Sequence, residues 1–374
     1  MPVPQTFKAA TFTAPGVAHT VADVSLPALE PGEVAIKVTA TAINPVDWKV
    51  HDIGFFLPGY PAILGSDAAG EIAALGPDVV GFDIGTRVFF QGIIGKYESS
   101  TFQQYTKMPA ALVSKTPSNI SDEQAAGVQL GTVAAVSGLY DKSGFGLPAP
   151  WDIGGDTAGD GKAIVIIGGS SSVGQYAIQL ARLSGFSRIV TNSSPAHVEY
   201  LKSLGAHVVL DRATQSTPEH FHQAIDGLPL PLAYDTIVHK STLLLGIKTL
   251  QLAKTPGATL VRSTADKEDL IAVVEGKSGA LDSDIVELAQ RGHGVELKGI
   301  VGIGSTPSLR HLSEPMVLNL GGEGGWIAKG LFVPNRPVVV SGGLSAVDEA
   351  LEKNKKGVSG EKVVIRPFEG ARGW

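Results

Sequence analysis

The chain has 374 residues and a formal net charge of −6, with 43% hydrophobic and 18% charged residues. This length exceeds one ordinary hydrophobic core, so we expect a globular protein of two domains. Lysine and arginine occur only in short groups, which argues against nucleic acid or an anionic membrane as a partner. The chain contains no cysteine, which excludes disulfides, thiolate nucleophiles and cysteine-bound metal clusters. No apolar run has the length of a membrane span, and the first residues lack the pattern of a signal peptide, so we expect a cytoplasmic protein.

The first third of the chain has the pattern of a β-rich domain. Between about residues 7 and 115, short β-branched runs such as "EVAIKVTATAI" and "TRVFFQG" are separated by turn signals such as "EPGE". This pattern predicts a barrel-like arrangement of strands. The glycine-, proline- and aspartate-rich segment 144–161 that comes later is predicted to be a surface loop.

From about residue 162, apolar strands alternate with helical patterns. We predict strands at 163–169, 188–192, 206–211, 232–239, 257–263 and 295–304. Such alternation builds a parallel sheet covered by helices on both faces, so the fold class is α/β with a Rossmann-type sheet. After about residue 305 we predict a helical stretch, the strand in "PVVVSGGL", a helix at 345–357 and the strand in "GEKVVIRP", and we assign these elements to the first domain.

A glycine-rich turn connects the first predicted parallel strand to its helix. The segment fits G-x-G-x-x-G with serine at the middle glycine. Its free amides and hydroxyls are suited to a pyrophosphate, and a strand–helix turn without a ligand is the alternative. The residues predicted to bind the cofactor here are Gly169, Ser170, Ser171, Ser172, Val173 and Gly174. The helix should bury Val173, Ala177, Leu180 and Ala181 and end at Gly185.

The tip of the second parallel strand indicates which dinucleotide is used. NAD sites place a carboxylate there, whereas in "RIVTNSSPAH" no carboxylate appears before Glu199. Asn192, Ser193 and Ser194 are donors that do not repel a phosphate, and His197 or Lys202 would add positive charge. This favours NADPH over NADH. Alternatively, the serines cap a helix that begins near Pro195, and both roles are compatible.

The segment "TPEHFHQA" contains possible metal ligands. Glu219 and His222 are three residues apart and would share a helix face, while His220 would point elsewhere. Two ligands are too few for a catalytic zinc, so we favour a helix start with Thr217 as cap and Pro218 in the first turn.

Several motifs together resemble a known family. "TAINPVDWK", "PAILGSDAAGEIAALG", "GGSSSVGQYAIQLA", "YDTI" and "GVSGEKVVI" are similar to the zinc-free, quinone-oxidoreductase branch of the medium-chain dehydrogenases/reductases, and within it to fungal trans-acting enoyl reductases that partner polyketide synthases. The resemblance implies a GroES-like catalytic domain at residues 1–135 and 310–374 around a Rossmann domain at 136–309.

The resemblance also implies that the metal site of the zinc-dependent relatives is missing. Where those relatives carry a catalytic cysteine, this chain has Asn44, and where they carry His-Glu it has Ser66 and Asp67. We therefore expect no metal. Without a Lewis acid, an α,β-unsaturated carbonyl is an easier substrate than an unactivated ketone, because hydride can add to its β-carbon while charge moves to the oxygen.

The resemblance points to Lys49 as the donor to that oxygen, and an exposed lysine after a turn is the alternative. Tyr60 is a second catalytic candidate, although a tyrosine that packs against a loop is as plausible. Asp47 is expected to hold its loop through backbone hydrogen bonds.

The resemblance assigns further contacts. The NADPH contacts outside the glycine-rich turn would be Val46, Asp47, Trp48, Lys49, Ser193, Ser194, Pro195, Ala196, His197, Val358 and Ser359, and the substrate channel would be lined by Gly131, Thr132, Val133 and Ala134. The family often has a tyrosine after the third-strand aspartate. Here Asp211 is followed by Arg212, which would stack on the adenine or reach the 2′-phosphate.

The leading hypothesis is an NADPH-dependent enoyl reductase that acts on a polyketide chain, with a carrier protein as a possible partner. The alternatives are a stand-alone quinone or enone reductase and a non-catalytic NADPH-binding protein. Either a monomer or a homodimer is compatible with the sequence.

Overall fold

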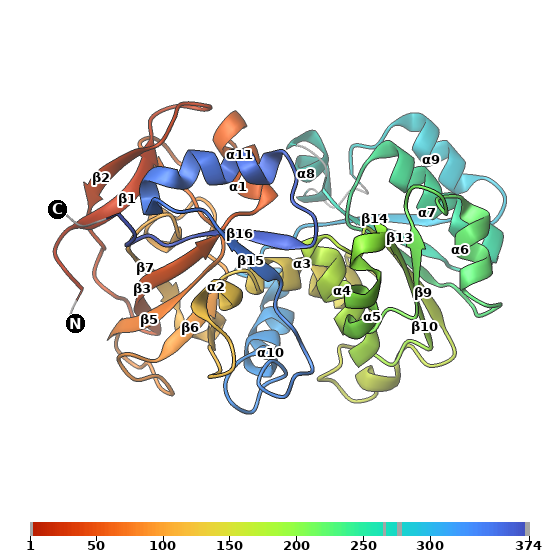
Figure 1. The fold of residues 1–374 in the computed structure, drawn as a ribbon, viewed down its shortest axis with the longest axis horizontal. Helices are drawn as coiled ribbons and strands as arrows, with labels where there is room; N and C mark the ends of the chain where they lie inside the picture. The colour runs from red at the N-terminus through yellow and green to blue at the C-terminus, as the bar shows by residue number, and fades with distance from the viewer. Residues whose placement is uncertain (1–2, 265–266, 275–278, 371–374) are drawn as a thin grey trace. The chain divides into compact units, whose positions relative to one another are not determined.

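The computed structural model describes residues 3–264, 267–274 and 279–370. The chain forms two compact units, one from residues 1–130 with 304–374 and the other from residues 131–303 (Figure 1). Within the described residues, no helix combines the length and apolar character needed to cross a membrane.

The first unit is β-rich, as predicted. Its larger sheet has the order β15-β16-β3-β5-β6-β8, with β7 also paired to β3, and its smaller sheet has the order β2-β1-β4. The strands are β1 (Phe7–Phe12), β2 (Thr20–Val24), β3 (Glu33–Ala42), β4 (Ala62–Ile63), β5 (Ala68–Leu75), β6 (Arg87–Phe90), β7 (Tyr105–Pro109), β8 (Val113–Lys115), β15 (Arg336–Val339) and β16 (Glu361–Ile365). The C-terminal segment returns to this unit, where β16 pairs antiparallel with β3.

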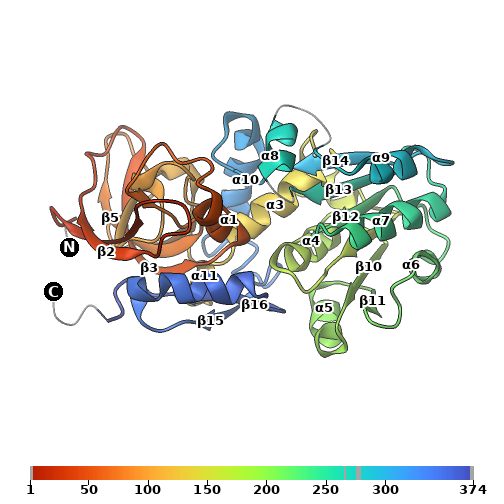
Figure 2. The same ribbon diagram turned by 90° about the horizontal axis from the view of Figure 1, so that it is seen from above.

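The helices of this unit are α1 (Pro45–Ile53), α2 (Asp122–Ala125), α10 (Arg310–Leu320) and α11 (Val347–Lys355). Helix α11 lies alongside β16, and its buried side chains share a core with α1 (Figure 2). Helix α1 begins where Asn44 caps it and Pro45 occupies the first position, and it ends at Gly54, whose φ of 68° is in the left-handed region. The start of α1 is therefore well defined by its sequence.

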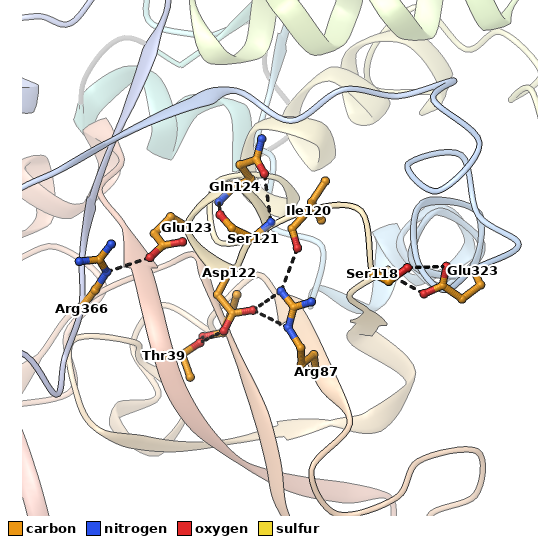
Figure 3. Close-up of polar contacts among 11 residues, drawn as sticks. Thr39, Arg87, Ser118, Ile120, Ser121, Asp122, Glu123, Gln124, Glu323 and Arg366 are labelled. Carbon is orange, nitrogen blue, oxygen red and sulfur yellow. Dashed lines mark hydrogen bonds and ion pairs between the residues drawn. The ribbon is translucent and has the colours of Figure 1, made fainter.

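Polar contacts around α2 attach the C-terminal segment to the strands (Figure 3). Asp122 receives hydrogen bonds from Arg87 Nε at 2.9 Å and from Thr39 Oγ1 at 2.7 Å. Arg366, just after β16, donates to Glu123 Oε1 at 2.8 Å. These charge-assisted contacts join segments far apart in the sequence into one unit.

The second unit contains a six-stranded sheet in the order β11-β10-β9-β12-β13-β14, and each adjacent pair is parallel. This confirms the predicted Rossmann-type fold. Its strands are β9 (Ala163–Ile167), β10 (Arg188–Ser193), β11 (Val208–Asp211), β12 (Leu232–Asp235), β13 (Thr259–Ser263) and β14 (Glu296–Ile300), and its helices are α3 (Gln129–Tyr140), α4 (Ser172–Leu183), α5 (Val198–Leu204), α6 (Pro218–Ala224), α7 (Lys240–Ala253), α8 (Lys267–Val274) and α9 (Ser283–Gln290).

Helices cover both faces of this sheet. Side chains of α6, α7 and α9 pack with Ala163, Val165 and Ile167 in one core cluster. Ile164 and Ile166 alternate with these residues, so they face the opposite side, and they are also fully buried. Helices α4 and α5 pack against each other, away from the cluster formed by α6, α7 and α9 (Figure 1).

Several strand ends and one helix position differ from the sequence-based predictions. The strands predicted at 163–169 and 295–304 end at Ile167 and Ile300. The strand predicted at 232–239 ends at Asp235, because Asp235 Oδ1 accepts hydrogen bonds from the backbone amides of Ile237 and Val238 and turns the chain. On α4, Ala177, Leu180 and Ala181 are buried as predicted, whereas Val173 is only half-buried. Val173 lies in the first turn of the helix, beside the glycine-rich turn.

Candidate functional site

The glycine-rich turn between β9 and α4 leaves no room for a side chain at Gly169 or Gly174. A Cβ added at Gly174 would lie 2.3 Å from the carbonyl oxygen of Gly168, and one at Gly169 would lie 2.2 Å from Thr191 Oγ1. Gly168 adopts a φ of 86°, which glycine tolerates far better than other residues. The turn therefore brings the start of α4 close to the end of β9, as a pyrophosphate site requires.

The three serines of this turn do not have equivalent roles. Ser171 is the N-cap of α4, and its Oγ accepts a hydrogen bond from Gly174 N at 2.9 Å. The hydroxyl of Ser171 also lies 2.8 Å from Thr236 Oγ1. Ser172 and Val173 supply the first amides of the helix, which point out of its N-terminus and are suited to bind an anion.

The tip of β10 supports the glycine-rich turn. Asn192 Oδ1 accepts a hydrogen bond from Gly168 N at 2.8 Å, so this side chain holds the turn. Ser193 is buried, and its Oγ donates to the carbonyl of Ser194 at 2.9 Å. Arg212 N donates to the carbonyl of Ser193 at 2.9 Å, which places Arg212 at the tip of β11 next to the serines.

The segment after β10 begins with a single 3₁₀ turn. Ser194 occupies the N-cap position of this turn, which covers Pro195–His197, but its side chain makes no capping hydrogen bond there. Pro195 and Ala196 are exposed. Lys202 lies on α5, where its Nζ is 3.4 Å from Glu199 Oε1.

Helix α1 carries Val46, Asp47, Trp48 and Lys49. The half-buried ammonium of Lys49 lies 5.6 Å from the centroid of the Trp48 ring, and Lys355 of α11 lies 5.5 Å from the same ring. Trp48 Nε1 donates to Asn354 Oδ1 at 3.1 Å. Two ammonium groups therefore lie within cation–π distance of the indole, and Lys49 is the one of the two that α1 itself carries.

A buried polar cluster lies at the start of α1. Asp47 Oδ2 accepts a hydrogen bond from Asn44 N at 2.7 Å, and Asp47 Oδ1 accepts one from Ser66 Oγ at 2.7 Å. The predicted backbone hydrogen bond of Asp47 is thus present. Asn44 Nδ2 is 3.4 Å from Ser66 Oγ. Burial raises the pKa of Asp47 to about 6, against the opposing effect of the Ser66 hydrogen bond.

Lys362 of β16 completes this cluster. Its ammonium donates to Asn44 Oδ1 and lies 3.7 Å from Asp67 Oδ2. Asp67 is fully buried, and its Oδ1 accepts a hydrogen bond from Leu130 N at 3.2 Å. Burial raises the pKa of Asp67 to about 7 and lowers the pKa of Lys362, and the mutual attraction of the two groups opposes both shifts.

The residues of this cluster do not fit a zinc ion. Zinc sites in proteins use cysteine, histidine and carboxylate ligands, whereas an amide and a hydroxyl stand at Asn44 and Ser66. The ammonium of Lys362 already lies at this point of the cluster and would repel a divalent cation.

Another group of possible metal ligands lies in the first unit, within the described residues. One ligand atom from each of His19, His51 and Asp348 lies within 4.8 Å of the others. The two imidazole rings are stacked at an interplanar angle of 22°, so their in-plane lone pairs do not converge on one point. His19 Nδ1 is 2.6 Å from Asp348 Oδ1, and His51 Nε2 is 2.8 Å from the carbonyl of Val17. The two histidines are therefore stacked on each other, and each has a hydrogen-bond partner of its own.

The structure shows the local geometry behind two further sequence-based alternatives. The segment "TPEHFHQA" forms α6 with Pro218 in the first turn, which confirms the interpretation as a helix start; Thr217 occupies the N-cap position, but its side chain makes no capping hydrogen bond there. Tyr60 is 41% exposed, and its ring packs edge-on against Phe12 at a centroid distance of 5.6 Å. The packing role of Tyr60 is therefore present.

The remaining predicted contact residues fall into two groups. Gly131, Thr132, Val133 and Ala134 are buried at the start of α3 within the second unit, where the carbonyl of Ala134 accepts a hydrogen bond from Tyr234 Oη at 2.8 Å. Val358 and Ser359 lie in the loop between α11 and β16, with Val358 packed on the core of the first unit and Ser359 exposed.

The fold and the glycine-rich turn are those of a known class of oxidoreductases. Residues 30–118 match the family described as "Alcohol dehydrogenase GroES-like domain", and residues 172–261 match "Zinc-binding dehydrogenase". The chain is 30% identical over 353 residues to "Dehydrogenase pigH" of Monascus ruber, covering 89% of this chain and 91% of that protein. The chain belongs to the medium-chain dehydrogenase/reductase family, whose members use a nicotinamide cofactor.

Fungal enoyl reductases are among its relatives within this family. The chain is 32% identical to "Trans-enoyl reductase tndF" of Aspergillus flavipes, covering 96% of this chain and 98% of that protein. It is 30% identical to "Trans-enoyl reductase himH" of Aspergillus japonicus, with 89% of both chains covered. The solved quinone oxidoreductase of Coxiella burnetii has the same fold, with a TM-score of 0.67, 20% identity, and coverage of 96% of this chain and 99% of that chain.

Two residues, Gly168 and Lys362, and one contact of Asn192 could not be predicted from the sequence. Gly168 precedes the matched glycine motif, and its positive φ becomes visible only in the turn. Asn192 is predicted as a donor to a phosphate, and the structure shows that its side-chain oxygen accepts a hydrogen bond from the glycine-rich turn. Lys362 stands at the start of an apolar strand, where a lysine is usually solvated, and the only signal was its phase with the buried Val364.

Proposed function

We propose that the protein is an NADPH-dependent reductase of the C=C bond in an α,β-unsaturated carbonyl, acting as a trans-acting enoyl reductase on a polyketide thioester. The observation that supports this proposal is the cluster at the start of α1, where the amide of Asn44 and the hydroxyl of Ser66 stand at positions that the resemblance assigns to metal ligands, and the ammonium of Lys362 lies beside them. Such a site favours a substrate whose own conjugation disperses the charge. The fungal trans-enoyl reductases support the substrate class.

The bound nicotinamide would supply the hydride. The chain's own residues have to orient the substrate and donate a hydrogen bond to the oxygen on which negative charge develops. We assign this donor role to Lys49, because its half-buried ammonium is restrained over Trp48. Tyr60, which is 41% exposed, is the second candidate for orienting the substrate.

The cofactor is proposed to be NADPH because of the residues at the tips of β10 and β11. Ser194 lies just after β10, where NAD-specific sites have a carboxylate, and Arg212 lies beside it at the tip of β11. The nearby Asp211 accepts hydrogen bonds from Ala213 N at 2.9 Å and Thr214 Oγ1 at 3.0 Å. These local bonds leave Asp211 poorly placed to bind a ribose. Arg212 would add a positive charge that a 2′-phosphate attracts.

The wider assignment keeps the expectations from the sequence. Residues 1–135 with 310–374 would be the catalytic domain, and residues 136–309 the dinucleotide-binding domain. The residues proposed to contact NADPH are Val46, Asp47, Trp48, Lys49, Gly169, Ser170, Ser171, Ser172, Val173, Gly174, Ser193, Ser194, Pro195, Ala196, His197, Arg212, Val358 and Ser359. Gly131, Thr132, Val133 and Ala134 are proposed to line the substrate channel.

The test is NADPH oxidation by the purified protein with a matched panel of substrates. The panel contains an enoyl thioester of pantetheine, the corresponding free enone, a quinone and the saturated ketone. We expect turnover of the enoyl thioester and no reduction of the saturated ketone. Preferential reduction of the quinone would replace the proposal with a stand-alone quinone reductase. Tight NADPH binding without any turnover would indicate a non-catalytic binding protein.

A further inference from the structure

Lys362 is an ammonium group inside the first unit. The residue is 3% exposed, although lysine is almost never fully buried unless it is paired. Its Nζ donates to Asn44 Oδ1, and Asp67 Oδ2 lies 3.7 Å away. Removing an ammonium from water without a partner is strongly unfavourable, so this position is compatible with a charged lysine only because the carboxylates are present.

The surroundings are shaped to hold this side chain. Gly127, in the loop after α2, passes so close to the lysine stem that a Cβ there would lie 2.7 Å from Lys362 Cγ. Asp67 Oδ2 is buried and accepts no hydrogen bond from the residues that the structure describes, so the ammonium is the positive group that it faces. Gly127 leaves space for the lysine stem, and Asp67 Oδ2 faces the ammonium, so the two residues together form a site for the cation that β16 carries.

The ammonium also fixes the groups that begin α1. Lys362 orients the side-chain oxygen of Asn44, which directs the Asn44 amide nitrogen toward Ser66. Ser66 in turn donates to Asp47, which accepts the backbone amide of Asn44. The contacts therefore form a closed chain around the N-terminus of the helix that carries Lys49.

We propose that the ammonium of Lys362 is the built-in cation of this cluster and takes the place of the metal ion around which zinc-dependent relatives arrange the same positions. Lys362 is a positioning residue, because it acts on Asn44 and Asp67 and reaches Lys49 only through α1. The inference extends the metal-free site proposed above. Its test measures charge and stability in place of turnover, so it can fail while reductase activity stands, and it can hold if the substrate proves different.

The cluster contains three titratable groups from three elements. They are Asp47 on α1, Asp67 before β5, and Lys362 on β16, so one positive charge faces two carboxyl groups. The pKa of Asp47 is raised to about 6 and that of Asp67 to about 7, in both cases mainly by burial. Removal of the ammonium would leave two buried carboxyl groups without a counter-charge above neutral pH.

The first experiment is a double-mutant cycle read by urea unfolding. At pH 8, Lys362→Met should lower the folding equilibrium constant at least tenfold, and at pH 5.5, where the carboxyl groups are protonated, it should lower it less. Adding Asp67→Asn should recover part of the loss at pH 8. The control is Lys107→Met, because Lys107 is another buried lysine, whose Nζ pairs with Glu33 Oε2 at 2.8 Å, and Asp67→Asn should not relieve its loss. A pH-independent loss for Lys362→Met that simply adds to that of Asp67→Asn would overturn the proposal.

The second experiment does not depend on whether Lys362→Met folds. Nitrogen-15 NMR of the lysine ammonium groups of the intact protein should show a slowly exchanging signal that disappears in Lys362→Arg. A nitrogen chemical shift of a neutral amine for Lys362 at pH 7 would contradict the proposal. Elemental analysis of protein purified without chelators should find no stoichiometric zinc. Zinc that is present in the native protein and lost in Asp67→Asn would assign the cluster to a metal instead.

Discussion

Gly174 gives the sharpest test that the turn between β9 and α4 binds a dinucleotide. In Gly174→Ala, the new methyl group would lie 2.3 Å from the carbonyl oxygen of Gly168 and 2.9 Å from Gly169 Cα. Both neighbours are backbone atoms, so no side chain can rotate away. The start of α4 must therefore move by about 1 Å to reach normal van der Waals contact.

The magnitude of the effect follows from this displacement. Overpacking of this kind lowers the free energy of unfolding by about 1–3 kcal/mol. The first amides of α4 move with the helix, and the loss of one hydrogen bond to a charged phosphate costs about 1.5–3 kcal/mol. The Kd for NADPH should therefore rise roughly tenfold to a hundredfold.

Calorimetric titration with NADPH measures the affinity, and urea unfolding measures the stability of the same samples. The matched control is Gly294→Ala in the loop before β14, where the nearest atom to the new methyl group is 4.0 Å away. This control should change neither quantity by more than the error. If folded Gly174→Ala binds NADPH as tightly as the native protein, the turn does not hold the pyrophosphate and the assignment of the cofactor site is wrong.

Three further predictions concern cofactor choice, catalysis and pH. Ser194→Asp places a carboxylate at the tip of β10 and should weaken NADPH relative to NADH by about 1–3 kcal/mol, which is roughly fivefold to a hundredfold. The same substitution at the exposed Ser203 on α5 should not change the preference, and equal preferences in both variants would remove the 2′-phosphate from this position. Lys49→Ala should lower kcat at least tenfold with little change in NADPH affinity. Lys355→Ala, which removes the other lysine over Trp48, should leave kcat nearly unchanged. Similar losses of kcat in both variants would mean that the lysines act by packing against Trp48. Burial raises the pKa of Asp67 to about 7, so the folded state binds this proton more tightly than the unfolded state does, and the contribution of Asp67 to stability is lost as the pH rises from about 4 to about 7. Asp67→Asn should therefore flatten the dependence of the unfolding free energy on pH over this range. An unchanged pH profile would mean that Asp67 titrates normally.

The parallel sheet could be predicted because strands that are buried on both faces consist of continuous apolar residues. Ala163, Val165 and Ile167 face one layer of helices while Ile164 and Ile166 face the other, so β9 is apolar throughout. The end of β12 could not be predicted in the same way. Apolar residues continue past Asp235, but its side chain captures two backbone amides and stops the strand.

The residues of the candidate site differ in the same way: some of their contacts are local in the sequence and others are long-range. Ser171 as helix cap follows from the local sequence, because its hydroxyl bonds to an amide three residues on. The contact of Lys362 with Asn44 joins residues 318 positions apart, and the hydrophobic periodicity of the sequence cannot predict such a contact. Long-range polar contacts depend on how β16 returns beside β3, which only the folded chain shows.

The difference between Asn192 and Lys362 shows how function is divided between backbone and side chains in this chain. Asn192 is polar and lies at the tip of a strand, and its side-chain oxygen accepts a hydrogen bond from Gly168 N, so it holds the glycine-rich turn. Lys362 lies in a strand among apolar residues, and its ammonium reaches Asn44 at the start of α1. In both cases the partner of the polar atom decides what the side chain does, and the partner is known only once the chain has folded.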